Sequence, residues 1–168
     1  GGAAFHLLRS HGAASVIGID IEPLVIRRAS ELAEKYQLTD QAKFQVVSPG
    51  PLPFPDGHFD MVFSKDAFLH IPDKETLMKD VARVLKPEGM IAASDWMRLD
   101  DGPLSEQLRD YIAAEGLDMH MCSLQRYEKA LAAAGFDHIH LNDRNAWYLN
   151  LAQDEHKSMT TPPLRDQI

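Results

Sequence analysis

The chain has 168 residues, about the length of one domain, and 45% of them are hydrophobic, so it can build a core. Its formal net charge of −8 argues against a nucleic-acid-binding module, because such modules carry a basic face. A single cysteine, Cys122, excludes an intramolecular disulfide and a cysteine-built zinc site. No apolar run approaches the roughly 18 residues that a membrane helix needs, and the chain opens without a basic, signal-like segment. We therefore expect a cytoplasmic protein with neither nucleic-acid nor membrane partners.

Apolar runs and helical stripes alternate along the first 95 residues. Four strands are expected, at 15–20, 42–47, 59–64 and 89–95. Two helices are expected between them, at about 23–37 and 73–85. Pro23 suits a first helical turn, and Asp73 suits an N-cap with Thr76 three residues later. This alternation predicts a doubly wound, mostly parallel α/β sheet.

Beyond residue 95 the pattern is weaker. Helices are expected at about 103–115, 124–134 and 145–158, and a last strand at 137–142. We expect one domain over 1–158 and a frayed tail over 159–168, which contains a Pro-Pro pair and little apolar content.

The two ends of the chain are unusual for this fold class. A doubly wound nucleotide-binding domain begins with a strand that leads into a glycine-rich turn. Here Gly1-Gly2 run straight into an apparent helix, AAFHLLRSH, and no strand follows the last helix. We therefore expect an internal segment of a larger domain, truncated at both ends.

A glycine turn, a helix and then an acid at the end of the next strand fit ribose-hydroxyl recognition in Rossmann-like folds. Gly1, Gly2 and Asp20 stand in this order. Only the tail of the glycine signature is present, so a chain-start remnant with a strand-end cap is the structural alternative.

The segment from Leu52 to Gly89 reads LPFPDGHFDMVFSKDAFLHIPDKETLMKDVARVLKPEG. It resembles the class I S-adenosylmethionine-dependent methyltransferases, with their LPFPDGSFD-type loop and VLKPGG turn. Within it, SKDAFLHIPDKETL resembles the small-amine N-methyltransferases, which include the phosphoethanolamine and the sarcosine/dimethylglycine enzymes. The later NDRNAWY and DEHK stretches are similar to that group too, so the resemblance runs from residue 1 to about 157.

The resemblance implies a cofactor, S-adenosyl-L-methionine, and residues that hold it. Gly1 and Gly2 would be the last glycines of the loop under the methionine and ribose. Asp20 would accept both ribose hydroxyls, and Ile21 would pack on the adenine.

Three further positions are implied in cofactor binding. Ser48 stands where the family usually has an aspartate on the adenine amino group, although a serine oxygen still accepts one hydrogen bond. Ser64 and Lys65 lie at the carboxyl end of the third expected strand, beside the cofactor position.

Asp66 and His70 are the candidate catalytic pair. They are four residues apart on an expected helical turn, so they can face the same cleft. The resemblance implies that the aspartate holds the substrate amine and that the histidine belongs to the catalytic apparatus. A carboxylate can orient an amine, and a histidine can take its proton. The structural alternative is that Asp66 caps a turn and His70 packs beneath it.

The expected substrate is a small amine without a phosphate. In phosphoethanolamine methyltransferases the helix after the fourth strand carries a tyrosine and, four residues on, an arginine for the phosphate. Tyr111 and Glu115 stand at these positions, and Glu115 would repel a phosphate. Trp96 could support a methylated ammonium by a cation–π contact. A slip in this alignment would leave Glu115 a solvated helix residue.

A metal site is not expected, and two other interpretations stay open. Glu115, Asp118, His120 and Cys122 match no standard ligand spacing, so no metal site is expected. A nicotinamide-dependent oxidoreductase would also use a glycine turn with Asp20. A non-catalytic methyltransferase remnant, which folds without turnover, would also fit the truncated ends.

The missing strand bears on assembly. In the family it lies between the strands expected at 15–20 and 59–64, and its absence leaves backbone groups unpaired. We expect those two strands to pair with each other, a separate strand to fill the gap, or another chain to cover it, for example in a homodimer.

Overall fold

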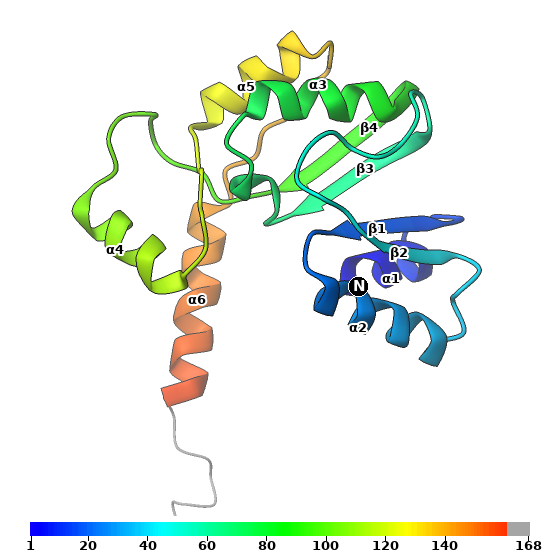
Figure 1. Ribbon diagram of the computed structural model, residues 1–168. Coiled ribbons are helices and arrows are strands. Elements are labelled where there is room, and N and C mark those ends of the chain that lie inside the picture. Colours follow the sequence, from blue (N-terminus) through cyan, green and yellow to red (C-terminus); the bar gives the residue numbers. More distant parts are fainter. Residues whose placement is uncertain (161–168) are drawn as a thin grey trace, which may run out of the picture. The chain divides into compact units, whose positions relative to one another are not determined.

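The computed structural model describes residues 1–160 (Figure 1). The chain forms two compact units, Gly1–His58 and Phe59–Ile168. Each unit contains its own two-stranded parallel sheet. The predicted α/β class, with strands in parallel, is confirmed.

The first unit contains two helices and two strands: α1 (Gly2–Ser10), β1 (Val16–Asp20), α2 (Pro23–Lys35) and β2 (Ala42–Val46). β1 and β2 pair in parallel from Val16 opposite Ala42 to Asp20 opposite Val46. Pro23 occupies the first turn of α2 as predicted, and the Glu22 side chain caps that turn. The core lies between α1, α2 and β2 and is built from Phe5, Ala33 and Ala42, with Leu8, Leu32, Leu38 and Phe44 packed against them.

The second unit begins with β3 (Phe59–Lys65), the 3₁₀ turn η1 (Phe68–His70), α3 (Lys74–Val84) and β4 (Leu85–Ser94). It continues with α4 (Glu106–Glu115), α5 (Leu124–Ala133) and α6 (Asn145–Thr160). β3 and β4 pair in parallel across the α3 crossover, and α5 packs against α3 (Figure 1). The Asp73 carboxylate accepts the amide of Thr76 at 2.9 Å, which confirms the predicted N-cap.

β4 starts four residues before the expected strand at 89–95. Its first residue, Leu85, pairs with Phe59, and regular pairing resumes only at Met90 opposite Met61. Between them the chain makes a turn in which Glu88 has φ +63°. A Cβ on Gly89 would lie 2.8 Å from the Lys86 carbonyl oxygen, so this close approach requires glycine.

One strand expected from the sequence is absent. Residues 137–142 form no strand, because His138 has φ +48°, a left-handed conformation that an extended ladder does not accept. Of the three arrangements considered for the missing strand, direct pairing of 15–20 with 59–64 is not seen: within residues 1–160, β1 pairs with β2 and β3 with β4. The expected tail at 159–168 lies mostly outside the described residues, although α6 continues through Thr160.

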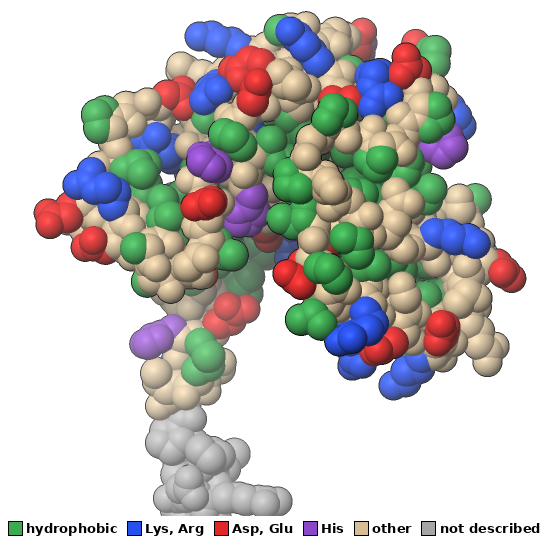
Figure 2. All heavy atoms as spheres, in the orientation of Figure 1, with side chains coloured by type: hydrophobic (Ala, Val, Ile, Leu, Met, Phe, Trp, Pro, Cys, Tyr) green, Lys and Arg blue, Asp and Glu red, His purple; other side chains and the backbone are tan. Residues whose placement is uncertain are grey.

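Apolar side chains reach the surface in both units, interspersed with charged ones (Figure 2). In the second unit Met61 and Phe63 share one face of β3, and Met90 lies opposite Met61 on β4. Their exposed fractions are 39%, 42% and 63%, so this sheet face is incompletely covered within its own unit. No helix in the part of the chain that the structure describes is long and apolar enough to cross a membrane.

Candidate functional site

Asp20 is the last residue of β1, as predicted, and is half-buried. Its Oδ1 accepts the amide of Glu22 at 3.0 Å, and its main-chain carbonyl accepts the amide of Val47 at 2.9 Å. These bonds fix the position of the residue through the backbone while Oδ2 keeps its capacity to accept. Ile21 follows with 62% of its surface exposed.

Gly1 and Gly2 differ in what surrounds them. A Cβ on Gly1 would lie 3.0 Å from the Phe5 ring and 3.1 Å from the Ala29 Cβ, so this glycine permits close packing of α1 on α2. A Cβ on Gly2 would meet nothing within 4 Å. Gly1 therefore has a packing role that does not depend on a ligand.

Ser48 lies in the proline-rich loop after β2 and is exposed. It lines an open hollow of about 550 Å³ that residues 45–51 and Pro53 form. The hollow lies wholly within the first unit. Asp20 is not among its lining residues, so the structure of this unit alone does not bring Asp20 and Ser48 to one pocket.

The carboxyl end of β3 carries Ser64 and Lys65. Ser64 is 7% exposed and its Oγ has no hydrogen-bond partner in the described structure. A buried hydroxyl without a partner costs free energy, so this atom is suited to a ligand or an ordered water. Lys65 is exposed, and its Nζ lies 3.8 Å from Asp66 Oδ2.

Asp66 and His70 are arranged differently from the expected helical turn. Asp66 has φ +52°, and its amide donates to the Ser94 carbonyl of β4 at 2.8 Å. His70 ends a 3₁₀ turn that begins only at Phe68. The expectation that they share a face by α-helical spacing is therefore wrong, because Asp66 lies outside the turn and is placed by β4. A left-handed non-glycine residue is a strained position of the kind that clusters at functional sites.

His70 is held by the loop after α4. Its Nδ1 lies 2.7 Å from the Asp118 carbonyl oxygen. A carbonyl only accepts, so we assign the proton to Nδ1, which leaves the Nε2 lone pair of the neutral ring free. His70 is exposed, so this lone pair can meet a ligand.

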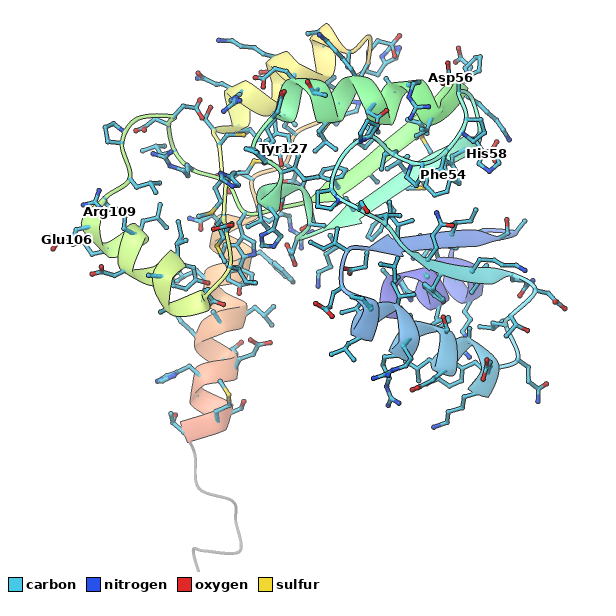
Figure 3. All side chains as sticks on the ribbon, viewed as in Figure 1. Phe54, Asp56, His58, Glu106, Arg109 and Tyr127 are labelled. Atoms are coloured by element: carbon cyan, nitrogen blue, oxygen red, sulfur yellow. The ribbon has the colours of Figure 1, made fainter. Side chains whose placement is uncertain are left out.

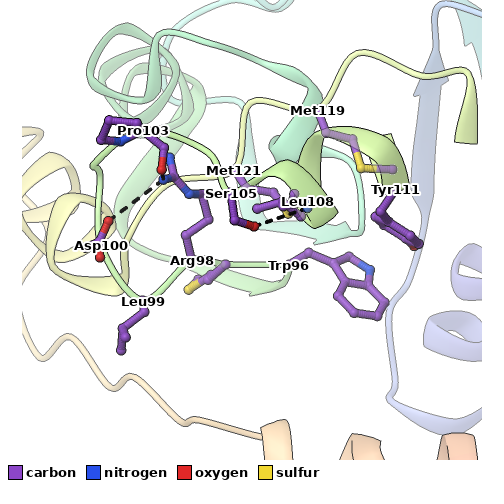
Figure 4. Close-up of a pocket in the computed structure, with 11 residues that line it drawn as sticks. Trp96, Arg98, Leu99, Asp100, Pro103, Ser105, Leu108, Tyr111, Met119 and Met121 are labelled. Carbon is purple, nitrogen blue, oxygen red and sulfur yellow. Dashed lines mark hydrogen bonds and ion pairs between the residues drawn. The ribbon is translucent and has the colours of Figure 1, made fainter. Parts of the chain in front are cut away.

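An open pocket of about 560 Å³ lies between the segment after β4 and α4 (Figure 4). Trp96 and Tyr111, both predicted to contact substrate, line it. Much of the remaining lining is apolar, from Met97, Leu99, Pro103, Leu108, Met119 and Met121. Arg98 is the one cation in the lining, and it binds the carbonyls of Gly102 and Pro103 and pairs with Asp100. Its side chain is 14% exposed, so it is poorly placed to bind an anion.

Trp96 packs its ring edge-to-face against Tyr148 of α6, with 4.7 Å between ring centroids. Glu115 does not line the pocket. It acts on Tyr111, four residues earlier in α4, through a hydrogen bond that raises the pKa of the tyrosine. Two of the three predicted substrate residues, Trp96 and Tyr111, thus line the pocket, and Glu115 acts on Tyr111 without lining it.

No sequence pattern marks three polar residues of the second unit: Lys74 and Tyr127, which are buried, and Asp95, which is half-buried. Lys74 is fully buried and Tyr127 is 4% exposed. Burial raises the pKa of Asp95, whereas its hydrogen bond from Tyr127 lowers it. No periodicity marks them, because lysine and aspartate at element ends are usually solvated. Within residues 1–160 no three or more His, Cys, Asp or Glu side chains group as metal ligands.

Comparison with known proteins gives the family. Residues 1–93 match the model of the methyltransferase domain. Phosphoethanolamine N-methyltransferase 1 of Zea mays is 33% identical over 155 residues, which cover 92% of this chain but 30% of that protein. The chain therefore spans about a third of the length of this relative. Sterol 24-C-methyltransferases are also among the relatives.

Solved structures agree with that result. A Galdieria sulphuraria protein assigned as a sarcosine dimethylglycine methyltransferase has a TM-score of 0.70 and 33% identity, covering 80% of this chain and 49% of that one. Phosphoethanolamine N-methyltransferase 2 of Haemonchus contortus, solved with S-adenosyl-L-methionine, has a TM-score of 0.84. It is 24% identical and covers 95% of this chain and 36% of that one, so it supports the fold alone. On the family match and these likenesses, the chain belongs to the methyltransferase domain family, with its Rossmann-like fold.

Proposed function

We propose that the protein transfers the methyl group of S-adenosyl-L-methionine to the nitrogen of a small amine that carries no phosphate. Family membership supports the reaction class and the cofactor. Proton removal from the amine is supported by the hydrogen bond from His70 Nδ1 to the Asp118 carbonyl, because this bond leaves Nε2 able to act as a base. When bound, S-adenosyl-L-methionine supplies a methyl group on a positively charged sulfur.

The residues present fit this cofactor. Asp20 ends β1 with Oδ2 still able to accept, which suits a ribose hydroxyl. We propose Gly1, Gly2, Ile21 and Ser48 as further contacts in the first unit. In the second unit the orphan Ser64 Oγ is a buried hydrogen-bonding group that lacks a partner, and Lys65 follows it.

His70 and Asp66 have distinct roles in this reaction. An amine attacks only through an uncharged lone pair, so its ammonium form must first lose a proton. His70 Nε2 accepts that proton, and Asp66 orients the nitrogen through its carboxylate. Orientation contributes to the rate beside the proton transfer, because a fixed approach removes an entropic cost.

The pocket supports an amine without a phosphate. A phosphate needs cationic donors such as a free arginine fork. Arg98 is engaged with two carbonyls and Asp100, and Glu115 adds a negative charge next to Tyr111. The exposed part of Trp96 is suited to a methylated ammonium.

Methyl-transfer kinetics test the proposal. Sarcosine, dimethylglycine, ethanolamine and phosphoethanolamine are compared as single substrates of the purified protein. We expect the highest kcat/KM with an unphosphorylated amine, and a preference for phosphoethanolamine would contradict the substrate part. Saturable binding of S-adenosylhomocysteine without turnover of any acceptor would favour the non-catalytic remnant.

A second function, methylation of carbon in an apolar acceptor, is favoured by the methionine- and leucine-rich lining of the pocket. It would need no free amine. Adding a methylated hydroquinone, an acceptor that is methylated on carbon, to the same assay separates the two functions. A carbon methyltransferase would consume the hydroquinone and leave the amines unmethylated.

We also propose that the protein acts in the cytoplasm and forms a homodimer. The exposed sheet face of Met61, Phe63 and Met90 supports a partner of some kind. Sedimentation equilibrium tests the dimer, and a monomer across the accessible concentrations would contradict it.

A further inference from the structure

Lys74 is fully buried although it opens α3, where a lysine would normally reach solvent. Its Nζ donates to the Phe68 carbonyl at 2.6 Å and also to the Ile71 carbonyl. Phe68 is the first residue of η1 and Ile71 is its C-cap. The ammonium therefore hydrogen-bonds to both ends of the three-residue turn that ends in His70.

The turn needs this support because its own hydrogen bonding is limited. The His70 amide bonds to the Ala67 carbonyl at 3.2 Å, and the Ile71 amide to the Phe68 carbonyl at 3.0 Å. A 3₁₀ turn of this length has poorer hydrogen-bond geometry than an α-helix. Its conformation must then come from the groups packed around it.

Asp95 and Tyr127 extend the support from two other elements. Asp95 follows β4 directly, and its Oδ2 accepts the Tyr127 hydroxyl of α5 at 2.6 Å. Asp95 Oδ1 has no hydrogen-bond partner in the described structure, and the main-chain amide of Leu69 in η1 lowers the pKa of the Asp95 carboxyl. Lys74 Nζ lies 5.7 Å from the centroid of the Tyr127 ring, within cation–π range. Figure 3 labels Tyr127 on α5.

The outer side of the turn meets the loop after α4. The His120 amide donates to the Leu69 carbonyl at 2.7 Å, next to the bond from His70 Nδ1 to Asp118. A shift of η1 would therefore change the bond that sets the His70 tautomer. The buried side and the imidazole are linked through three consecutive residues, 68–70.

We propose that Lys74, Asp95 and Tyr127 form a positioning network that holds the His70 imidazole with its proton on Nδ1 and Nε2 free. The inference rests on the proposed function for its catalytic meaning. In this proposal the three residues do not contact the substrate, and they act on His70 through the turn 68–70. Burying an ammonium is costly, and a methionine would fill the same space, so packing alone gives little reason for a lysine here.

Lys74→Met removes the ammonium and keeps an unbranched apolar side chain. Lys79→Met, on the exposed side of the same helix, is the matched control. Two readouts are compared: steady-state kinetics with the preferred amine, and long-range ¹H–¹⁵N spectra of the imidazoles, with His70 assigned through His70→Gln.

In wild-type protein and the control, His70 should show the Nδ1–H tautomer. In Lys74→Met we expect that signature to be lost and kcat to fall about tenfold or more, with KM little changed, since misplacement acts on the chemical step. The thermal midpoint should fall, because the carbonyls of Phe68 and Ile71 lose their buried donor. An unchanged His70 spectrum would overturn the network.

If Lys74→Met fails to fold, Tyr127→Phe keeps the ring and removes only the hydroxyl that Asp95 accepts. The same spectrum and the same split between kcat and KM then decide. If the wild-type protein methylates no amine, the proposed function fails, and the spectrum still supports or overturns the network by itself.

Discussion

The two units hold their candidate residues by different means. In the first unit Asp20 is placed at a strand end by hydrogen bonds from two main-chain amides, and none of the polar side chains of residues 1–58 is buried. In the second unit the buried Lys74 side chain donates to the Phe68 carbonyl of the turn that ends in His70. The Leu69 amide of the same turn lowers the pKa of Asp95. Residues of the first kind can be replaced without disturbing the fold, whereas residues of the second kind couple the site to the core. Substitutions in the two units should therefore alter different quantities.

The largest effect is expected at His70. His70→Gln should lower kcat about 10²–10³-fold, because general-base catalysis contributes that much. Stability should change little, since His70 is exposed. His140→Gln, another exposed histidine, is the control. Equal kcat values for the two variants would remove His70 from the reaction.

Asp20→Ala should weaken S-adenosylhomocysteine binding by about 2–3 kcal/mol, the cost of losing charge-assisted bonds to hydroxyls. Isothermal calorimetry measures this, with the exposed Asp40→Ala as control. We expect the thermal midpoint to stay within the control's range, as the comparison of the units requires. Unchanged affinity would exclude Asp20 from the site.

Glu115→Arg should raise kcat/KM for phosphoethanolamine by about tenfold, because a repulsive charge becomes an attractive fork. The exposed Glu106→Arg at the other end of α4 controls for overall charge. If both variants gain equally, the effect is one of net charge and Glu115 has no special place at the substrate.

The smallest effect is expected at the pair between Glu75 of α3 and Arg126 of α5. Two bonds of 2.9 Å join them, and this pairing lowers the pKa of Glu75 to about 2. Both side chains are partly exposed, so Glu75→Gln should cost only about 0.5–1 kcal/mol in the free energy of unfolding.

The pH dependence of this pair has a definite sign. The folded pKa of Glu75 lies below its ordinary 4.5, so the stabilisation is present above pH 4.5 and is lost as pH falls towards about 2. In urea unfolding, wild type and Glu75→Gln should therefore converge on acidification. A gap that stayed constant down to pH 3 would contradict this.

The elements with strong local signals were predictable from the sequence. Pro23 and the Asp73 cap mark helix starts through local chemistry, and both were correct. The strand expected at 137–142 failed because alternation alone cannot show that His138 has a left-handed backbone or that the run lacks a pairing partner.

The candidate site was predictable only in part. Trp96 and Tyr111 do line one pocket. The spacing of Asp66 and His70 predicts that they share one face of a helix. That prediction is wrong, because Asp66 is instead placed by its hydrogen bond to Ser94 of β4. The burial of Lys74 could not be predicted from the sequence, because it depends on carbonyls that only the tertiary fold brings to the side chain.

A one-pot competition tests the central claim most directly. The protein is given S-adenosyl-L-methionine with a deuterated methyl group and equal concentrations of sarcosine, dimethylglycine, ethanolamine and phosphoethanolamine, and the products are identified by mass spectrometry. We expect the label to appear first on an unphosphorylated amine. Label that appears first on phosphoethanolamine would contradict it.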